Sequence, residues 1–428
     1  MKRALLSQIK HDWKENLWLV IELMIVSLVI WWLTLTLLRS YKDSQVPLGA
    51  DMTDVYAAEI TLLPSGEENN HASENTHEQI SEQDERYVNA LQAMLDRVKS
   101  LPMVEAAALG NNAMPYSYMN IDQGISTLQG KDTVTFYTNI RGMTPDGARV
   151  LRLQSLTDLT TDDLKKILEK GDILIGPSLE YEVNDSVKDF FKNHLVGKEV
   201  LYTGIKIGGL IHAVRRTDYE TNILKGTTIR PIMEGSRALL ELDNLLVRVK
   251  PGMGKEFMEA MQQEPALVSP TLIALNKLRS MERDKKLILW KDQVNNRTKI
   301  AGIIFLLVII FIGLLGTFWY RVYLRTPEVA VRKTFGATDI DIFRRFLSEA
   351  FMILGIALGL SLIICLVSMD YLTNNLLQYV AYFKTWKWDM TLAGLITMAV
   401  MSLMIFIGVG IPARRAMKIE TAVALKEE

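Results

Sequence analysis

Apolar residues are concentrated in four long runs instead of being spread evenly along the chain. The runs cover residues 17–38, 300–320, 350–369 and 392–411. Each run is close to the roughly 20 apolar residues that a helix needs to cross the hydrocarbon core of a bilayer. A cleaved signal peptide is excluded for the first run, because Trp31 and Trp32 are bulky and no small-residue cleavage site follows. The pattern therefore predicts four transmembrane helices.

The long segment between the first two runs, residues 39–297, has the mixed periodicity of an α+β domain. Alternating apolar positions predict strands, and spacing of three to four residues predicts helices. The expected strands are 55–63, 104–110, 244–250 and 269–275, and the expected helices are 84–100 and 254–263. Two β-α-β units in this order predict a split ferredoxin-like module, built from about 50–110 plus 244–280.

A long insert, residues 111–243, separates these two units. It contains short strand-like stretches between glycine-rich turns such as Gly208-Gly209. The stretches are 133–141, 172–175, 199–201 and 206–215. We expect an inserted, mostly β subdomain here.

Two other segments of this region have a distinctive composition. Residues 65–86 are acidic, polar and free of aromatics, so they cannot bury enough apolar surface to fold and are predicted to be a mobile loop. His71 and His77 in this loop lack the spacing of metal ligands. Residues 271–299 are charged and helical in pattern, and are predicted to form a stiff stalk that leads into the second transmembrane helix.

Positive charge is uneven along the chain, although the totals of 48 basic and 49 acidic residues nearly cancel. Lys and Arg are concentrated in the leader (1–16), the segment 321–349 and the tail (412–428), whereas the loop 370–391 carries little excess. Cytoplasmic loops carry such an excess. Both termini and 321–349 are therefore predicted to be cytoplasmic, and 39–297 to be periplasmic, in a protein of the inner (plasma) membrane. The expected fold class is an α-helical membrane domain of four transmembrane helices plus a large α+β extracytoplasmic domain.

Glu22 is a formal charge inside a predicted span. A carboxylate within the bilayer marks a candidate functional site by default. Glu22 lies only about one helical turn into its run, however, so its side chain can also reach the headgroups or pair with Lys14. Both interpretations stay open, and the simpler structural one is favoured.

The basic segment 321–349 has the local signals of a short helix that lies on the membrane surface. Thr326 is predicted to cap this helix, Pro327 suits its first position, and Glu328 faces the positive end of its dipole. The same pattern would arise in an ordinary interfacial helix that only anchors the loop.

The end of this helix and the start of the next one are also marked. Gly336 is expected to end the first helix in a left-handed conformation. Thr338 and Asp341 are expected to open the following helix as a capping box, with Asp in place of Glu. That second helix leads into the third apolar run.

The stretch EVAVRKTFGATDIDIFRRFLSEA, residues 328–350, resembles the coupling segment of the MacB/FtsX-like ABC transporter permeases, the type VII or mechanotransmission family. The matching residues are Glu328, Val331, Arg332, Lys333, Gly336, Ala337, Glu349 and Ala350. Ala330 departs from the family pattern, which has glycine there. The closing segment 410–428 and the outer stretches RGMTPDGARVLRLQ and GDILIGPSLE also resemble this family, as does the plan of one span, a large outer domain and three further spans.

The resemblance implies a permease subunit that transmits the ATP-driven motion of a separate ATPase to its periplasmic domain, and so exports or extrudes a periplasmic peptide, toxin or drug. The implied partners are cytoplasmic ABC ATPase subunits, a second permease subunit in a homo- or heterodimer, membrane lipid and, as a further candidate, a periplasmic adaptor. The implied ATPase-coupling residues are Pro327, Glu328, Val331, Arg332, Lys333, Phe335 and Gly336. A LolC/LolE-like lipoprotein-releasing permease, an FtsX-like regulator of a cell-wall hydrolase and a four-span sensor or scaffold remain alternatives.

No constellation of side chains in the sequence supports catalysis by this chain. The nucleotide-binding motif G-x-x-x-x-G-K-[ST] does not occur, and Gly252-Met253-Gly254-Lys255 lacks its spacing and its hydroxyl. The single cysteine, Cys365, lies in the third apolar run, and the five histidines lack metal-ligand spacing. We therefore expect no enzymatic activity, no metal, no nucleic-acid partner and no cofactor bound by this chain, with ATP and Mg²⁺ on the partner ATPase.

Overall fold

The computed structural model describes most of the chain. The described residues are 13–63, 82–116, 121–129, 132–178, 189, 191, 193–219, 226–263, 272–371 and 386–417. The histidines of the predicted mobile loop, most of the leader and of the loop 370–391, and the tail after residue 417 lie outside them. The chain divides into two compact units, which we call the membrane unit (Met1–Lys42 with Gln293–Glu428) and the outer unit (Asp43–Asp292).

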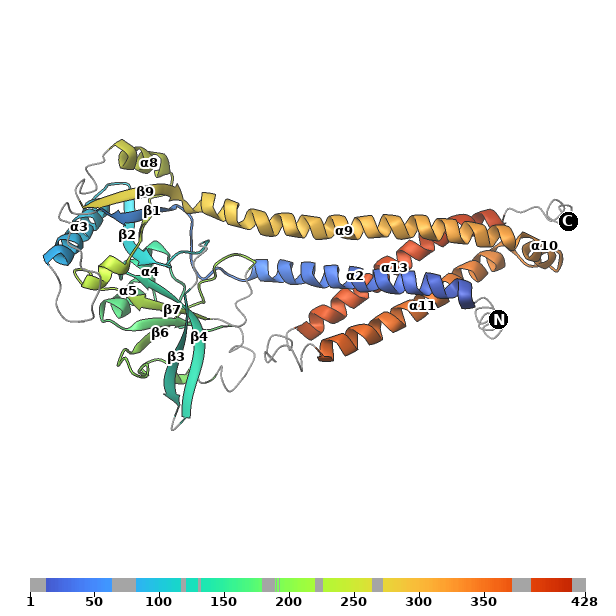
Figure 1. Ribbon diagram of the computed structural model, residues 1–428, viewed down its shortest axis with the longest axis horizontal. Coiled ribbons are helices and arrows are strands. Elements are labelled where there is room, and N and C mark those ends of the chain that lie inside the picture. Colours follow the sequence, from blue (N-terminus) through green and yellow to red (C-terminus); the bar gives the residue numbers. More distant parts are fainter. Residues whose placement is uncertain are drawn as a thin grey trace. The chain divides into compact units, whose positions relative to one another are not determined.

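Figure 1 labels most of the elements, and the outer unit contains both helices and strands. The helices are α2 (Trp13–Gln45), α3 (Glu82–Lys99), α4 (Gly147–Val150), α5 (Thr161–Glu169), the 3₁₀ helix η1 (Arg237–Glu241), α8 (Gly254–Gln263), α9 (Met281–Leu324), α10 (Thr326–Thr334), α11 (Asp339–Tyr371) and α13 (Trp386–Met417). The strands are β1 (Val55–Leu62), β2 (Val104–Asn111), β3 (Asp122–Gln129), β4 (Asp132–Met143), β5 (Ile173–Gly176), β6 (Ile207–Leu210), β7 (Gly226–Pro231), β8 (Asn244–Val249) and β9 (Ile273–Ser280).

Four helices of the described chain, α2, α9, α11 and α13, are long and apolar enough to cross a membrane, and they contain the four expected spans. Within the membrane unit, α11 and α13 lie side by side (Figure 1). Apolar side chains from all four helices pack into one core. Between α2 and α11, the hydroxyl oxygens of Ser27 and Ser361 are 2.6 Å apart and share a buried hydrogen bond. Such bonds join helices where no water competes for the hydroxyl groups.

The outer unit contains a nine-stranded sheet, in which the order is β6-β5-β7-β4-β2-β8-β1-β9 and β3 pairs with β4. Strand β1 pairs antiparallel with both β8 and β9, and β2 pairs antiparallel with β8. Helix α3 connects β1 to β2, and α8 connects β8 to β9. Buried residues of α3 and Phe257 of α8 share one core with these strands. The two expected β-α-β units are therefore interleaved in a single sheet.

The strands of the insert 111–243 continue this sheet. Strand β4 pairs with β2 at Gly110↔Met143 and Asn111↔Gly142. Strands β3 and β7 and helix α5 lie where the sequence pattern predicted no element. The expected strand 199–201 forms only isolated bridges, and 206–215 yields the four-residue strand β6. Short strands of this kind depend on partners that are distant in sequence, so their own side-chain pattern predicts them poorly.

The helical stalk predicted over 271–299 is wrong in its first part. Ile273–Ser280 is strand β9, which pairs along β1, and α9 begins only at Met281. The weak helical spacing before Met281 is overridden by hydrogen bonding to β1, a partner that is far away in sequence. From Met281 to Leu324 the helix is continuous.

Asp146 ties two helices of the outer unit together. Its carboxylate lies 2.7 Å from Lys99 Nζ, at the end of α3, and 2.6 Å from Lys165 Nζ, in α5. Burial acts to raise the pKa of Asp146, but the hydrogen bonds from Lys165 and Lys99 outweigh it and hold this pKa below its ordinary value. The carboxylate is therefore ionised in the folded protein at neutral pH.

Candidate functional site

The candidate site is α10 with the residues around it, and its first turn differs from expectation. Thr326 does not cap the helix: it lies inside α10, and its hydroxyl donates to the carbonyl of Val322, 3.1 Å away. The reason is that only Arg325 separates α10 from α9, so Thr326 already lies one turn beyond Val322. Pro327 occupies the first turn, as expected for a residue without an N–H group to donate.

The C-terminal end of α10 follows the prediction. Gly336 has a φ of +90°, in the left-handed region. The N–H of Gly336 donates to the carbonyl of Lys333 (3.0 Å), and that of Ala337 donates to the carbonyl of Arg332 (3.0 Å). These bonds satisfy the last carbonyl groups of the helix, as in other helices that end at glycine.

The start of α11 also follows the prediction. The N–H of Thr338 donates to Asp341 Oδ2 (3.1 Å), and the N–H of Asp341 donates to Thr338 Oγ1 (3.3 Å). These reciprocal bonds form a capping box with Asp in place of Glu. The helix then continues toward its apolar section without interruption.

Helix α10 has an inner and an outer apolar face. Val329 and Ala330 point inward and are buried, and Val329 belongs to the core of the membrane unit. On the outer face, Val331 is 44% exposed and Phe335 is 88% exposed. Because these two residues are four positions apart, they lie on the same side of the helix. The outer face therefore presents apolar surface that the described part of this chain leaves accessible.

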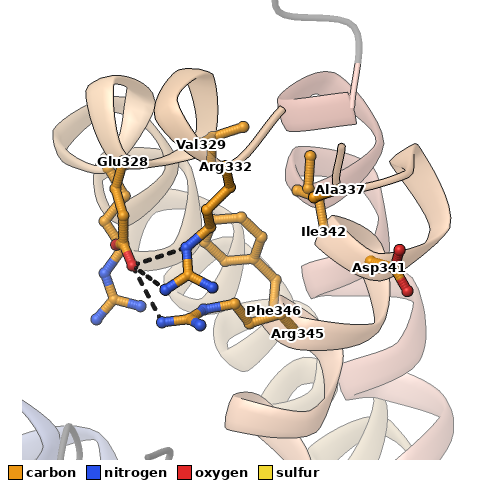
Figure 2. Close-up of a pocket in the computed structure, with 9 residues that line it drawn as sticks. Glu328, Val329, Arg332, Ala337, Asp341, Ile342, Arg345 and Phe346 are labelled. Carbon is orange, nitrogen blue, oxygen red and sulfur yellow. Dashed lines mark hydrogen bonds and ion pairs between the residues drawn. The ribbon is translucent and has the colours of Figure 1, made fainter. Parts of the chain in front are cut away.

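The polar side of α10 is bonded to α11 through one carboxylate. Figure 2 shows that Arg332 of α10 and Arg345 of α11 both reach Glu328. Arg332 donates to Glu328 Oε1 from Nε (3.1 Å) and Nη2 (2.6 Å), and Arg345 Nη2 donates to the same oxygen (3.1 Å). The bond from Arg345 attaches α10 to the second turn of α11, whereas the bonds from Arg332 lie within α10.

A second carboxylate, Glu349, binds the residues that precede α10. It is 2% exposed, and accepts from Arg321 Nη1 (3.0 Å) and Arg325 Nη1 (2.6 Å). Arg321 belongs to the last turn of α9, whereas Glu349 lies in α11. The buried pair therefore joins the two helices on either side of α10.

Lys333 makes a third attachment. Its Nζ lies 2.9 Å from Asp339 Oδ1 in α11 and donates to the backbone carbonyl of Met417 in α13 (2.5 Å). Together with the Glu328 and Glu349 clusters, this contact links the segment that contains α10 to the end of α9, the start of α11 and the end of α13. A displacement of α10 would therefore act directly on three of the four long helices.

A pocket of about 210 Å³ lies between α10 and α11. Its polar lining includes Arg325, Glu328, Arg332, Asp341 and Arg345, and its apolar lining is Val329, Ala337, Ile342 and Phe346 (Figure 2). Three guanidinium groups and four apolar side chains therefore line the same cavity.

Glu22 lies apart from this site. It is in α2, and a side chain at Gly313 of α9 would come within 3.2 Å of its Oε1. The absence of a side chain at Gly313 therefore makes room for the carboxylate. Of the predicted coupling residues, the structure brings Glu328 and Lys333 into contact with neighbouring elements of this unit, and Arg332 shares the Glu328 carboxylate, while Pro327, Val331, Phe335 and Gly336 are exposed.

Two residues of this network had no assigned role from the sequence. Glu349 matched only as part of a family pattern, and Arg345 counted only as positive charge. Their spacing was a signal that could have found both. Arg345 and Glu349 lie about one and two helical turns after the capping Asp341 and therefore on the same side of α11. Their partners, however, belong to helices whose packing the sequence does not reveal.

Part of this chain is similar to a known family. Residues 300–421 match the family described as FtsX-like permease C-terminal. A curated protein of Pseudomonas fluorescens (strain Pf0-1), described as a "probable export ATP-binding/permease protein", is 31% identical over 125 residues. That match covers 28% of this chain and 18% of the relative, so the chain spans only a small part of the relative's length.

Among solved structures, the chain is similar to the extracellular domain of the noncanonic ABC-type transporter YknZ from Gram-positive bacteria. The match covers 52% of this chain and 100% of that domain, at 11% identity and a TM-score of 0.28.

Proposed function

We propose that the chain is the membrane-spanning subunit of a MacB-like ABC transporter, because residues 300–421 match the family described as FtsX-like permease C-terminal. In this role it receives the motion of a separate cytoplasmic ABC ATPase through α10. It passes this motion through α9 to the outer unit, which exports or extrudes a periplasmic substrate such as a peptide, toxin or drug. A second permease subunit completes the membrane part. The ATPase holds the ATP and Mg²⁺.

The observation that carries this proposal is the outer face of α10. Val331 and Phe335 are exposed apolar side chains on a helix whose other contacts all lead to the long helices. Phenyl rings are enriched at contacts between proteins relative to the rest of the protein surface. In the proposed complex this face lies in a groove of the ATPase.

The remaining coupling residues keep α10 in place. Pro327 and Gly336 define its ends. Glu328 with Arg345, and Lys333 with Asp339, bind it to α11, and Arg332 pairs with Glu328 within α10. A helix held in this way moves with its neighbours instead of sliding over them. Only a difference in affinity of α10 for two states of the ATPase can drive such a change.

Two finer features belong to the same proposal. The excess of Lys and Arg in residues 321–349 supports a cytoplasmic position of α10, with both termini on that side and the outer unit in the periplasm. The strand order β2-β8-β1-β9, with α3 and α8 as the connections, supports the split ferredoxin-like interpretation of the outer unit.

The test is co-purification of the full-length chain from its native host in mild detergent, with mass-spectrometric identification of the proteins retained. We expect an ABC ATPase with the wild type, and a loss of at least tenfold in the double variant Val331→Ser, Phe335→Ser. Ile340→Ser is the matched control, because Ile340 is also exposed but belongs to the first turn of α11. Absence of any ATPase with the wild type, or equal retention by all variants, would falsify the proposal.

A further inference from the structure

The pocket between α10 and α11 has features that the ATPase contact does not explain. Three guanidinium groups, from Arg325, Arg332 and Arg345, line a cavity of about 210 Å³. This cavity is formed by the polar side of α10, whereas Val331 and Phe335 lie on its exposed apolar face. We propose that this pocket binds the phosphate group of an anionic phospholipid. The inference goes beyond the coupling role and does not depend on the presence of an ATPase.

The polar lining fits a phosphate. Arginine presents a planar fork of N–H donors that matches two phosphate oxygens, and is for this reason the usual residue at phosphate sites. Arg332 and Arg345 come from different helices but meet at a single oxygen, Glu328 Oε1. Their forks are therefore oriented together before any ligand arrives.

The apolar lining distinguishes a lipid from a free anion. Val329, Ile342 and Phe346 form part of the wall and are buried. A dissolved phosphate ion has no apolar part to place there, whereas the glycerol and first acyl carbons of a phospholipid do. A basic pocket between membrane helices on the cytoplasmic side is also the usual form of an anionic headgroup site.

The position along the chain places the pocket at the level of the headgroups. Trp319, Tyr320 and Tyr323 are exposed in the last turns of α9, directly before Arg325. Tryptophan and tyrosine side chains concentrate at the boundary between hydrocarbon and water. The Arg415 guanidinium lies over the Trp319 ring, 4.5 Å from its centroid, as expected for a cation at the same depth. The pocket therefore opens where lipid phosphates lie.

The experiment uses the full-length chain, purified in a neutral detergent. It is exposed to equal amounts of dioleoyl phosphatidylglycerol and dioleoyl phosphatidylcholine, and native mass spectrometry counts the lipids retained. We expect phosphatidylglycerol to be preferred. Arg345→Gln should lower this preference about fivefold, the effect of one arginine at an anionic membrane surface. Arg344→Gln, its exposed neighbour outside the pocket, should retain the preference.

A second variant and a competing ion distinguish the remaining explanations. Arg332→Gln tests the same pocket from α10, in case Arg345→Gln does not fold. Inorganic phosphate, added as a competitor of the lipid, distinguishes a lipid phosphate from a free one. If millimolar phosphate displaces the lipid fully, the site is one for free phosphate and the lipid assignment is overturned. Equal preference in wild type, Arg345→Gln and Arg332→Gln overturns it too. If these variants lose only the co-purified ATPase, the pocket is a protein contact, and the coupling role stands without the lipid.

Discussion

Arg321 and Glu349 form a buried ion pair, with Arg321 Nη1 3.0 Å from Glu349 Oε1, although 28 positions separate them in the chain. The pair joins the two sides of the segment that contains α10, because Arg321 lies in the last turn of α9 and Glu349 lies in α11. Arg325 binds the other oxygen of the same carboxylate at 2.6 Å. The short helix is thus held at its base by one carboxylate and two guanidinium groups.

Glu349→Gln should therefore destabilise the membrane unit strongly. Removal of the carboxylate leaves two poorly exposed guanidinium groups without this counter-charge, and breaking a buried pair typically costs about 3–5 kcal/mol. Reversible unfolding of the full-length chain in mixed detergent micelles would measure the change in the free energy of unfolding. The control is Asp339→Asn, which removes an exposed partner of Lys333 and should cost less than about 1 kcal/mol. Equal effects of the two variants would contradict this assignment.

Gly336→Ala should weaken the end of α10. No atom lies within 4 Å of the added methyl group, so any loss comes from the backbone, whose φ of +90° is unfavourable for a residue with a side chain. The expected cost is about 1 kcal/mol. Gly355→Ala is the control. A methyl group added at Gly355 also has no atom within 4 Å, but Gly355 lies inside helix α11. That control should be neutral or stabilising by up to about 1 kcal/mol. If both variants unfold alike, the backbone argument fails.

Reversing the charges of Arg332 and Lys333 together, both to Glu, should uncouple α10 while the chain still inserts in the membrane. The new carboxylates would face Glu328 and Asp339, the acidic partners of the native side chains. We expect the amount of inserted protein to be unchanged, and nucleotide-dependent transport or ATPase stimulation to fall at least tenfold. Arg344→Glu changes an exposed residue outside the pocket and should have little effect. Normal coupling in the double variant would count against the role of these residues.

Ser27 and Ser361 should be energetically coupled. A double-mutant cycle of the two alanine variants isolates their mutual hydrogen bond from the bonds that each also makes to a helix carbonyl. The expected coupling is about 0.6 kcal/mol, a usual value for hydrogen bonds between helices in a bilayer. Ser27→Ala combined with Thr397→Ala serves as the control, because Thr397 bonds within its own helix and the two effects should be additive. Additivity of the Ser27 and Ser361 variants would exclude the interhelical bond.

Asp146→Asn should change how the outer unit responds to acid. The folded protein holds the pKa of Asp146 below its ordinary value. This group therefore stabilises the fold above the pKa of the unfolded chain, about 3.9, and the stabilisation is lost as the pH falls through the lower folded value. In the variant this part of the acid sensitivity should be absent, and stability at pH 7 should be lower.

Thermal unfolding of the outer unit within the full-length chain, followed between about pH 3 and pH 7, would measure both effects. Asp162→Asn is the control, because it removes an exposed ion pair with Arg149, and such pairs contribute little. The same pH profile for wild type and Asp146→Asn would rule out the assigned role of Asp146.

The sequence by itself determined those parts of the molecule whose physical cause is local. Twenty apolar residues in a row predict a transmembrane helix in any context. The left-handed Gly336 and the capping box of Thr338 and Asp341 also depend on residues only a few positions apart, and the structure confirms both. Thr326 was the exception, because the close approach of α9 left it inside the helix.

Only the tertiary structure decided which residues meet across helices and strands. Strand β9 was predicted only in part, over 269–275, and residues 276–280 were assigned to the helical stalk, because the partner β1 lies more than 200 positions earlier, as in the pair Tyr56↔Ser280. In the same way, no local pattern shows that Arg345 and Arg332 share one oxygen of Glu328, or that Val331 faces outward while Val329 is buried. These contacts depend on how separate helices pack, a choice made by the summed burial of many side chains and not by the residues of any one segment.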